Sequence, residues 1–169
     1  MKSKLLVSAC LMGFQVRYNG SEKAQLAATL SRWQQAERLV IHCPELAAGL
    51  PTPRLPAEIV GGTGGDVLAG RARIVESDGR DVTGHYQLAA WLALHAAREA
   101  GCQAALLTDG SPTCGSQFVY DGSFRARRKA GAGVAAELLR AHGITVFSDG
   151  QIPQLLAWMA QREQDDDSV

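Results

Sequence analysis

The 169-residue sequence lacks several features that mark large classes of protein. No stretch approaches the roughly 18 consecutive apolar residues of a transmembrane helix. No GxxxxGK[ST] motif is present, so the sequence offers no P-loop for nucleotide phosphates. Excess charge is also missing, because 17 basic residues balance 17 acidic ones. A balanced surface gives no general attraction to phosphate backbones, which argues against a dedicated nucleic-acid-binding protein.

Cysteine is scarce and never closely paired, since the chain holds four cysteines and no C-x-x-C motif. Most structural zinc sites use such close pairs, so a zinc-stabilised binding module is an alternative rather than the first interpretation. The N-terminal apolar run, Leu5 to Cys10, has only the length of a strand and is too interrupted for a secretory signal. We therefore expect a cytoplasmic protein, in which cysteines serve as metal ligands or reactive thiols rather than in disulfides.

Length and composition predict one globular domain. With 46% apolar and 20% charged residues, a chain of this length buries a core of ordinary size. Short runs rich in Val, Ile and Leu alternate with longer segments of helical period. The apolar runs cover residues 4–9, 38–42, 104–108 and 144–147, and the helical segments cover 22 towards 39, 86–100, 134–141 and 152–161.

This alternation predicts a single-domain, Rossmann-like α/β fold of three layers, with a mostly parallel sheet of four to five strands and helices on both faces. We expect the domain to span residues 1–162 and the acidic tail, 163–169, to be disordered. Residues 48–82 are rich in proline and glycine and interrupt the alternation. We predict a long loop there that covers a functional site.

Three cysteines stand where an apolar run, or the short loop after it, gives way to turn residues. They are Cys10, Cys43 and Cys114. The carboxyl ends of parallel strands meet at one edge of a sheet, where ligands bind, so the three thiols are predicted to share a site. The fourth, Cys102, directly precedes an apolar run and belongs to the opposite edge. We interpret Cys102 as a small core residue.

An iron–sulfur cluster suits thiols that come from separate loops, because it is several ångströms across. With three cysteines, one iron of a four-iron cluster would stay open as a Lewis acid. A metal-free alternative is a sulfur-relay protein that carries persulfide on a reactive thiol such as Cys114. The zinc-stabilised binding module is the second alternative.

Two further residues are candidates for chemistry beside these thiols. Glu45 follows Cys43 and Pro44 at a predicted helix start, where it is suited either to general acid–base work or to capping the helix electrostatically. Ser111 opens the turn that carries Cys114, where its hydroxyl can hold a substrate or bond to backbone amides.

The segment from Gly131 to Ala136 fits the form G-x-G-x-x-A of dinucleotide-binding loops. Its left flank is a cationic stretch, Arg125 to Lys129, where that motif requires a strand, so we disfavour dinucleotide binding. A solvated basic loop is the simplest interpretation, and an anion site at the following helix start is the alternative.

Six ordered segments together resemble a bacterial domain family that includes the 2-thiouracil desulfurases. They are VSACLMG, CPELAAGLPTPRLPAEI, DVTG, DGSPTCGS, YDGSF and GAGVAAELLRAHGITVFS, and the resemblance covers about residues 3 to 160. It implies a [4Fe-4S] cluster held by Cys10, Cys43 and Cys114. It also implies an enzyme that removes sulfur from a thiolated pyrimidine such as 2-thiouracil, by non-redox hydrolysis at the open iron, with assistance from Glu45 and Ser111.

The expected partner is a small-molecule thiolated base. Ser8, Arg17 and Arg54 are the candidate substrate-binding residues, and the two arginines are also suited to holding a phosphate. A thiolated nucleoside or RNA is an alternative substrate, although zero net charge argues against nucleic acid. We expect no membrane association and a monomer.

Overall fold

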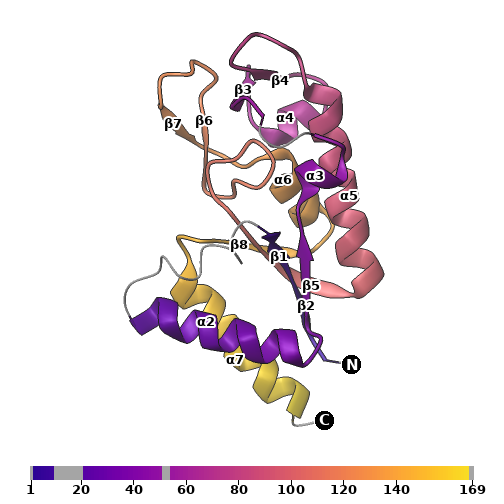
Figure 1. The fold of residues 1–169 in the computed structure, drawn as a ribbon, viewed down its shortest axis with the longest axis vertical. Coiled ribbons are helices and arrows are strands. Elements are labelled where there is room, and N and C mark those ends of the chain that lie inside the picture. Colours follow the sequence, from indigo (N-terminus) through magenta and orange to yellow (C-terminus); the bar gives the residue numbers. More distant parts are fainter. Residues whose placement is uncertain (1, 10–20, 51–53, 168–169) are drawn as a thin grey trace.

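The computed structural model describes residues 2–9, 21–50 and 54–167 and shows a three-layer α/β fold (Figure 1). The first part of the chain forms β1 (Lys4–Ser8), α2 (Ser21–Gln35), β2 (Leu39–His42), α3 (Pro44–Ala47), β3 (Ala57–Val60), α4 (Gly64–Leu68) and β4 (Arg73–Glu76). The second part forms α5 (Thr83–Ala100), β5 (Cys102–Leu107), β6 (Phe118–Tyr120), β7 (Arg128–Ala130), α6 (Val134–Ala141), β8 (Thr145–Ser148) and α7 (Ile152–Asp167). Two predicted site residues, Cys10 and Arg17, lie outside the described residues.

The central sheet has four parallel strands in the order β2-β1-β5-β8. This confirms the fold predicted from the alternation of apolar runs and helical segments. The chain passes from β1 to β2 on one side and later returns to place β5 on the other side of β1. In open α/β sheets, ligands bind beyond the carboxyl ends of the strands at such a reversal. The functional edge is therefore the one where β1, β2 and β5 end.

Alternate residues of each strand face opposite layers. Leu5 and Val7 pack with apolar side chains of α2 and α7, whereas Leu6 packs with those of α5 and α6. In Figure 1, α2 and α7 lie together on one side of the sheet, and α5 and α6 lie on the other. A strand needs this two-sided cover because side chains two residues apart share a face, and both faces here are apolar.

Residues 48–82 are not the long loop that their composition predicts. Beyond residue 53 they form an antiparallel β3–β4 hairpin with α4 between its strands. Ile59, Val67 and Ile74 are fully buried and join the main core. Gly61 and Gly70 have φ angles of 90° and 81°, so they serve the turns at either end of α4. These glycines therefore form the turns between regular elements.

The acidic tail also differs from its prediction, because α7 continues to Asp167. Trp33 Nε1 donates a hydrogen bond of 2.7 Å to Glu163, and Arg38 forms an ion pair of 2.6 Å with Asp166. The Arg38 guanidinium also stacks on the Trp33 ring, 4.0 Å from its centroid. Residues 163–167 are helical because Glu163 and Asp166 meet these partners from α2 and the segment after it.

The third sheet of the described structure has two strands and is separate from the central sheet. It is the antiparallel hairpin of β6 and β7, which lies beside β3 and β4 at the upper end of the molecule in Figure 1. The predicted basic loop includes its tip and the start of β7. No helix in the described parts of the chain combines the length and apolarity needed to cross a membrane.

Candidate functional site

The first wall of the site begins where β2 ends. Cys43 is the residue before α3, with extended backbone angles, and Pro44 occupies the first helical turn as the sequence predicts. Proline suits that position because its missing N–H would have no partner there. Glu45 follows in the same turn. The start of this short helix therefore places a thiol and a carboxylate, two residues apart, at one edge of the sheet.

The second wall is the loop after β5. One carboxylate oxygen of Asp109 accepts hydrogen bonds from the backbone N–H groups of Ser116, Gln117 and Phe118, at 3.0, 3.1 and 3.2 Å. These bonds close the loop that contains Cys114. A Cβ atom on Gly115 would lie 2.6 Å from the Phe118 carbonyl oxygen, so glycine is required where the loop folds back. The cysteine therefore sits in a rigid turn.

Backbone N–H groups at the N-terminus of α6 bind the same loop. Val134 and Ala135 donate their backbone N–H groups to the carbonyl oxygens of Pro112 and Thr113, at 2.9 and 2.8 Å. A Cβ atom on Gly133 would lie 2.5 Å from the Pro112 carbonyl oxygen. A strand does precede Gly131, contrary to the sequence interpretation, but it belongs to the antiparallel hairpin. The glycine motif thus serves the cysteine loop and leaves those two amides unavailable to an anion.

Glu45 connects the two walls. Its Oε1 atom accepts a hydrogen bond of 2.8 Å from the Thr113 hydroxyl and one of 3.3 Å from the Ser111 hydroxyl. Its Oε2 atom forms an ion pair with Arg54. The Glu45 and Arg54 side chains are only 15% and 22% exposed, so water screens this pair weakly. The residues flanking Cys43 and Cys114 are thereby held together.

The described cysteines divide as their sequence positions predict. Cys43 is partly exposed and Cys114 is buried, each in a loop after a strand end, and neither is in a disulfide. Cys102 begins β5 at the opposite edge, and burial raises the pKa of its thiol to about 11. Among the described residues no group of three or more His, Cys, Asp or Glu could hold a metal ion. Cys10, the third predicted ligand, is outside that set.

Ser8 and His42 end the neighbouring strands β1 and β2. Ser8, a predicted substrate-binding residue, is buried at this edge. Burial lowers the pKa of His42, and its buried Nε2 atom has no hydrogen-bond partner in the described structure. The imidazole is therefore neutral near pH 7.

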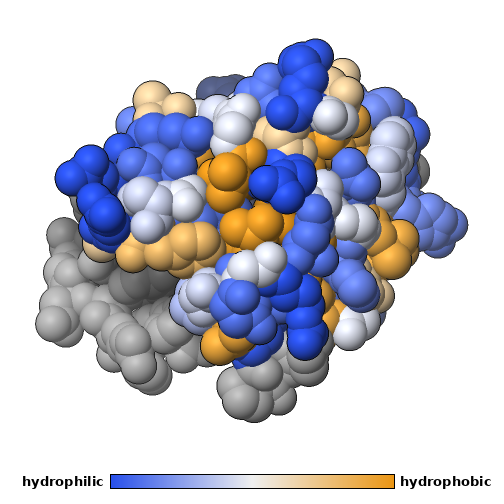
Figure 2. Space-filling view, turned by 90° about the horizontal axis from the view of Figure 1, so that it is seen from above, coloured by the Kyte–Doolittle hydropathy of each residue, from blue (hydrophilic) through white to orange (hydrophobic). Residues whose placement is uncertain are grey.

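A cavity of about 940 Å³ opens beside the Glu45 carboxylate. Glu45, Ser111 and Arg54, all predicted from the sequence, lie along it together with Asp109 and Tyr86. Burial raises the pKa of the Tyr86 phenol, although the nearby Arg54 opposes this, so the phenol is protonated at neutral pH. In the view of Figure 2, apolar residues are exposed between hydrophilic ones over this end of the molecule.

Sequence reasoning missed several residues at the site besides Asp109 and Tyr86. Thr113 is fully buried and bonds to Glu45, while Tyr120 and Phe124 line the cavity from the β6–β7 hairpin. All three lie in the segments DGSPTCGS and YDGSF, which carry the resemblance to a known family. Those segments could have pointed to these residues as part of the site. No local sequence pattern, however, indicates which residues their side chains contact.

Comparison with known proteins gives three consistent results. The family model described as 2-thiouracil desulfurase matches residues 5–151. An uncharacterised protein of Bacillus subtilis (strain 168), YbbK, is 43% identical over 152 residues, which cover 90% of this chain and 99% of that protein. Among solved structures, the [4Fe-4S]-dependent thiouracil desulfidase TudS is 38% identical, with a TM-score of 0.77 and coverage of 95% of this chain and 99% of that one.

Proposed function

Because the chain belongs to the 2-thiouracil desulfurase family, we propose that it removes sulfur from a thiolated pyrimidine base such as 2-thiouracil. The reaction exchanges the thiocarbonyl sulfur for the oxygen of water, giving a carbonyl and hydrogen sulfide, with no net oxidation or reduction. The single observation that carries this proposal is Glu45, held between the loops of Cys43 and Cys114 and facing a cavity large enough for a base.

The cofactor proposed is a [4Fe-4S] cluster held by Cys10, Cys43 and Cys114. The donor set fits, because two thiols that are not in disulfides follow β2 and β5, and Cys10 follows β1, which pairs with both strands. When bound by three cysteines, such a cluster supplies one open iron as a Lewis acid for the substrate sulfur. The solved structure at 38% identity is named as [4Fe-4S]-dependent, which supports the same cofactor here.

Glu45 is proposed to move the proton. It takes a proton from the water that attacks the thiocarbonyl carbon and returns it to the departing sulfur. A general base needs a fixed carboxylate, and Thr113 and Arg54 fix its two oxygen atoms separately. A carboxylate that could rotate freely would spend little time facing the attacking water.

Ser111 is proposed to orient the substrate. Its oxygen accepts hydrogen bonds from the backbone N–H groups of Thr113 and Cys114, at 3.1 and 3.3 Å. Its hydroxyl hydrogen is directed to Glu45 across 3.3 Å, which is a longer contact than the one from Thr113. This weaker bond is the one that a polar atom of the substrate can replace at least cost.

The substrate proposed is a small base. Arg54 lines the cavity and is positioned to meet a polar edge of the ring, and Ser8 and Arg17 are proposed to contribute to binding on the sequence interpretation alone. A cavity of about 940 Å³ exceeds the need of a pyrimidine, so a thiolated nucleoside is the second substrate to assay.

The test is anaerobic purification, analysis for iron, sulfide and zinc, and an assay for uracil and sulfide released from 2-thiouracil. We expect about four irons and four sulfides per chain. Cys43→Ser abolishes both iron binding and desulfuration, whereas the matched Cys102→Ser variant retains both.

The alternatives predict different results. Protein that stays iron-free after anaerobic reconstitution overturns the cluster proposal. One zinc per chain then points to a binding module, and a persulfidated thiol points to a sulfur relay. Protein that carries the cluster but releases no sulfide from 2-thiouracil rejects the substrate class.

A further inference from the structure

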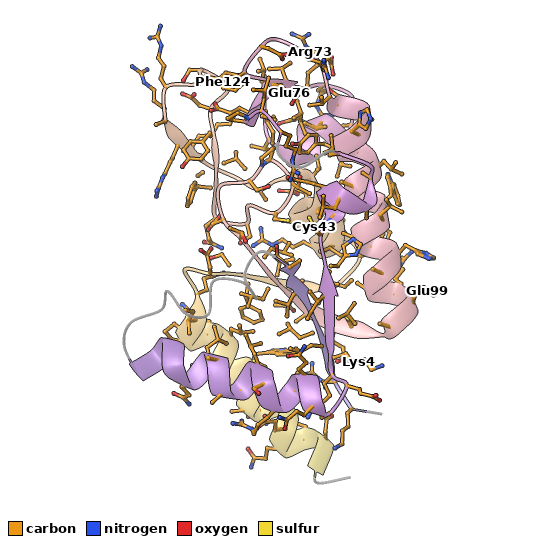
Figure 3. All side chains as sticks on the ribbon, viewed as in Figure 1. Lys4, Cys43, Arg73, Glu76, Glu99 and Phe124 are labelled. Carbon is orange, nitrogen blue, oxygen red and sulfur yellow. The ribbon has the colours of Figure 1, made fainter. Side chains whose placement is uncertain are left out.

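The tip of the β6–β7 hairpin places an aromatic ring at the cavity. Phe124 lines the cavity and is 37% exposed. In Figure 3 it lies at the tip of the hairpin, on the side of β3 and β4. The Phe124 ring is therefore available to whatever enters the cavity.

The backbone at this tip is held in a conformation that it would not adopt freely. Phe124 and Ala126 both have a φ angle of 58°, in the left-handed region that non-glycine residues seldom occupy. Such conformations persist where surrounding contacts impose them, and they concentrate at functional sites. At this tip the contacts come from the carboxylates of Glu58 and Asp121.

Glu58, on β3, binds the tip of the β6–β7 hairpin. One oxygen of its carboxylate accepts hydrogen bonds from the backbone N–H groups of Gly122 and Phe124, at 2.9 and 3.2 Å. Asp121 closes the turn from within, since its carboxylate accepts hydrogen bonds from the backbone N–H and the hydroxyl of Ser123, at 2.9 and 2.5 Å. The tip, including the backbone of Phe124, is therefore bound to a different element of the fold.

The hairpin is also tied to the loop that carries Ser111. The backbone N–H of Gly110 donates to the Phe118 carbonyl oxygen at 3.3 Å, and Gly110 pairs with Val119 as an isolated bridge. The Tyr120 ring lines the same cavity and meets the Phe118 ring edge-on, with centroids 6.1 Å apart. The aromatic wall and the proposed catalytic loop thus form one connected structure.

The cavity lining combines two kinds of side chain. Glu45, Ser111 and Arg54 are polar or charged, whereas Phe124 and Tyr120 are aromatic. A planar heterocycle offers a match for both kinds, with polar atoms on its edge and apolar π faces. Base–aromatic stacking tolerates different ring substituents because every such ring has a π face.

From this arrangement we propose that Phe124 is a specificity-determining residue that stacks on the face of the substrate ring, in a position set by Glu58. This inference rests on the proposed function for the identity of the reacting group. It adds that the site selects planar aromatic rings over non-planar or acyclic thiocarbonyl compounds that carry the same polar atoms.

The test compares two unreactive probes by calorimetry on the anaerobically prepared protein. Uracil and 5,6-dihydrouracil share the same N–H and C=O groups, but only uracil is an aromatic plane. We expect the native protein to bind uracil more tightly. Phe124→Ala weakens uracil binding by about fivefold or more and removes most of the preference for uracil over dihydrouracil.

Three variants separate stacking from general disruption. Glu58→Ala weakens uracil binding by a similar factor without altering the ring, while Glu58→Gln keeps an acceptor oxygen and most of the affinity. Leu88→Ala removes another exposed apolar side chain, on α5 and outside the cavity, and leaves binding unchanged.

A Phe124→Ala protein with a native circular dichroism spectrum and uracil affinity within about twofold of the native protein would overturn the inference. An equal loss of affinity for both probes would do so as well. Because neither probe is desulfurated, this result is independent of the activity test, and either hypothesis can fail alone.

Discussion

The hydroxyl of Thr113 donates a hydrogen bond of 2.8 Å to Glu45 Oε1, across 68 positions of sequence. Thr113 immediately precedes Cys114, and Glu45 lies two residues after Cys43. One short bond therefore fixes the proposed general base relative to both thiol-bearing loops. Thr113 is fully buried, so water cannot replace the bond when the hydroxyl is removed.

Thr113→Val is expected to lower kcat by about tenfold or more while the iron content is retained, since a hydrogen bond to a charged group contributes about 1.5–3 kcal/mol. The change keeps the side chain's shape but frees Glu45 to rotate away from the attacking water. Thr113 is a positioning residue, so KM for 2-thiouracil changes less than kcat. Thr29→Val is the control, because Thr29 donates only to a carbonyl within α2. Equal kcat values for the two variants would contradict the positioning role.

Gly133→Ala is expected to reduce the free energy of unfolding by about 1–3 kcal/mol, the usual cost of forcing an atom into a packed site. The added Cβ would lie 2.5 Å from the Pro112 carbonyl oxygen, which is backbone and cannot move alone. Displacement of that loop also lowers the iron content. Gly84→Ala is the control, since a Cβ there meets nothing within 4 Å. Urea unfolding monitored by circular dichroism measures both variants.

Cys102 is expected to resist alkylation by iodoacetamide at pH 8 in the folded protein. Burial raises the pKa of its thiol to about 11, so the reactive thiolate is almost absent at that pH. In denaturant the thiol becomes exposed and reacts. Mass spectrometry of digested protein, labelled before and after unfolding, measures the difference. Rapid labelling of native protein at Cys102 would show that this thiol is accessible.

Asp166→Asn is expected to lower the melting temperature at pH 7, because it leaves the buried Arg38 guanidinium without its carboxylate partner. In the native protein the pKa of Asp166 is lowered, first by the hydrogen bond from the Ser3 backbone N–H and also by the charge of Arg38. A lowered folded-state pKa contributes stability above the ordinary aspartate pKa of about 4 and loses it as pH falls through the folded-state value.

The melting temperatures of the native and Asp166→Asn proteins should therefore differ most near neutral pH, begin to converge below about pH 4, and converge fully only below the lowered folded-state pKa of Asp166. Differential scanning calorimetry at several pH values measures this. Asp165→Asn is the charge-matched control, since Asp165 is exposed on the same helix. A difference that stayed constant down to pH 2 would exclude the carboxylate as its source.

Local spacing in the sequence specifies the sheet and helix arrangement of this protein. Period-two alternation gives Leu5 and Leu6 opposite faces, and the alternation of runs and helices specifies a parallel sheet with two covered faces. It also placed Cys43 and Cys114 after strand ends and Cys102 at the opposite edge. These features follow from local spacing, because backbone geometry links each position to its neighbours.

The contacts between side chains distant in sequence become visible in the folded protein alone. The bonds from Thr113 to Glu45, from Phe124 to Glu58 and from Arg38 to Asp166 span 68, 66 and 128 positions. No periodicity encodes such pairs, because they depend on how whole elements pack. For that reason composition misjudged residues 54–82 and residues 163–167, both of which form regular structure against partners far away in sequence.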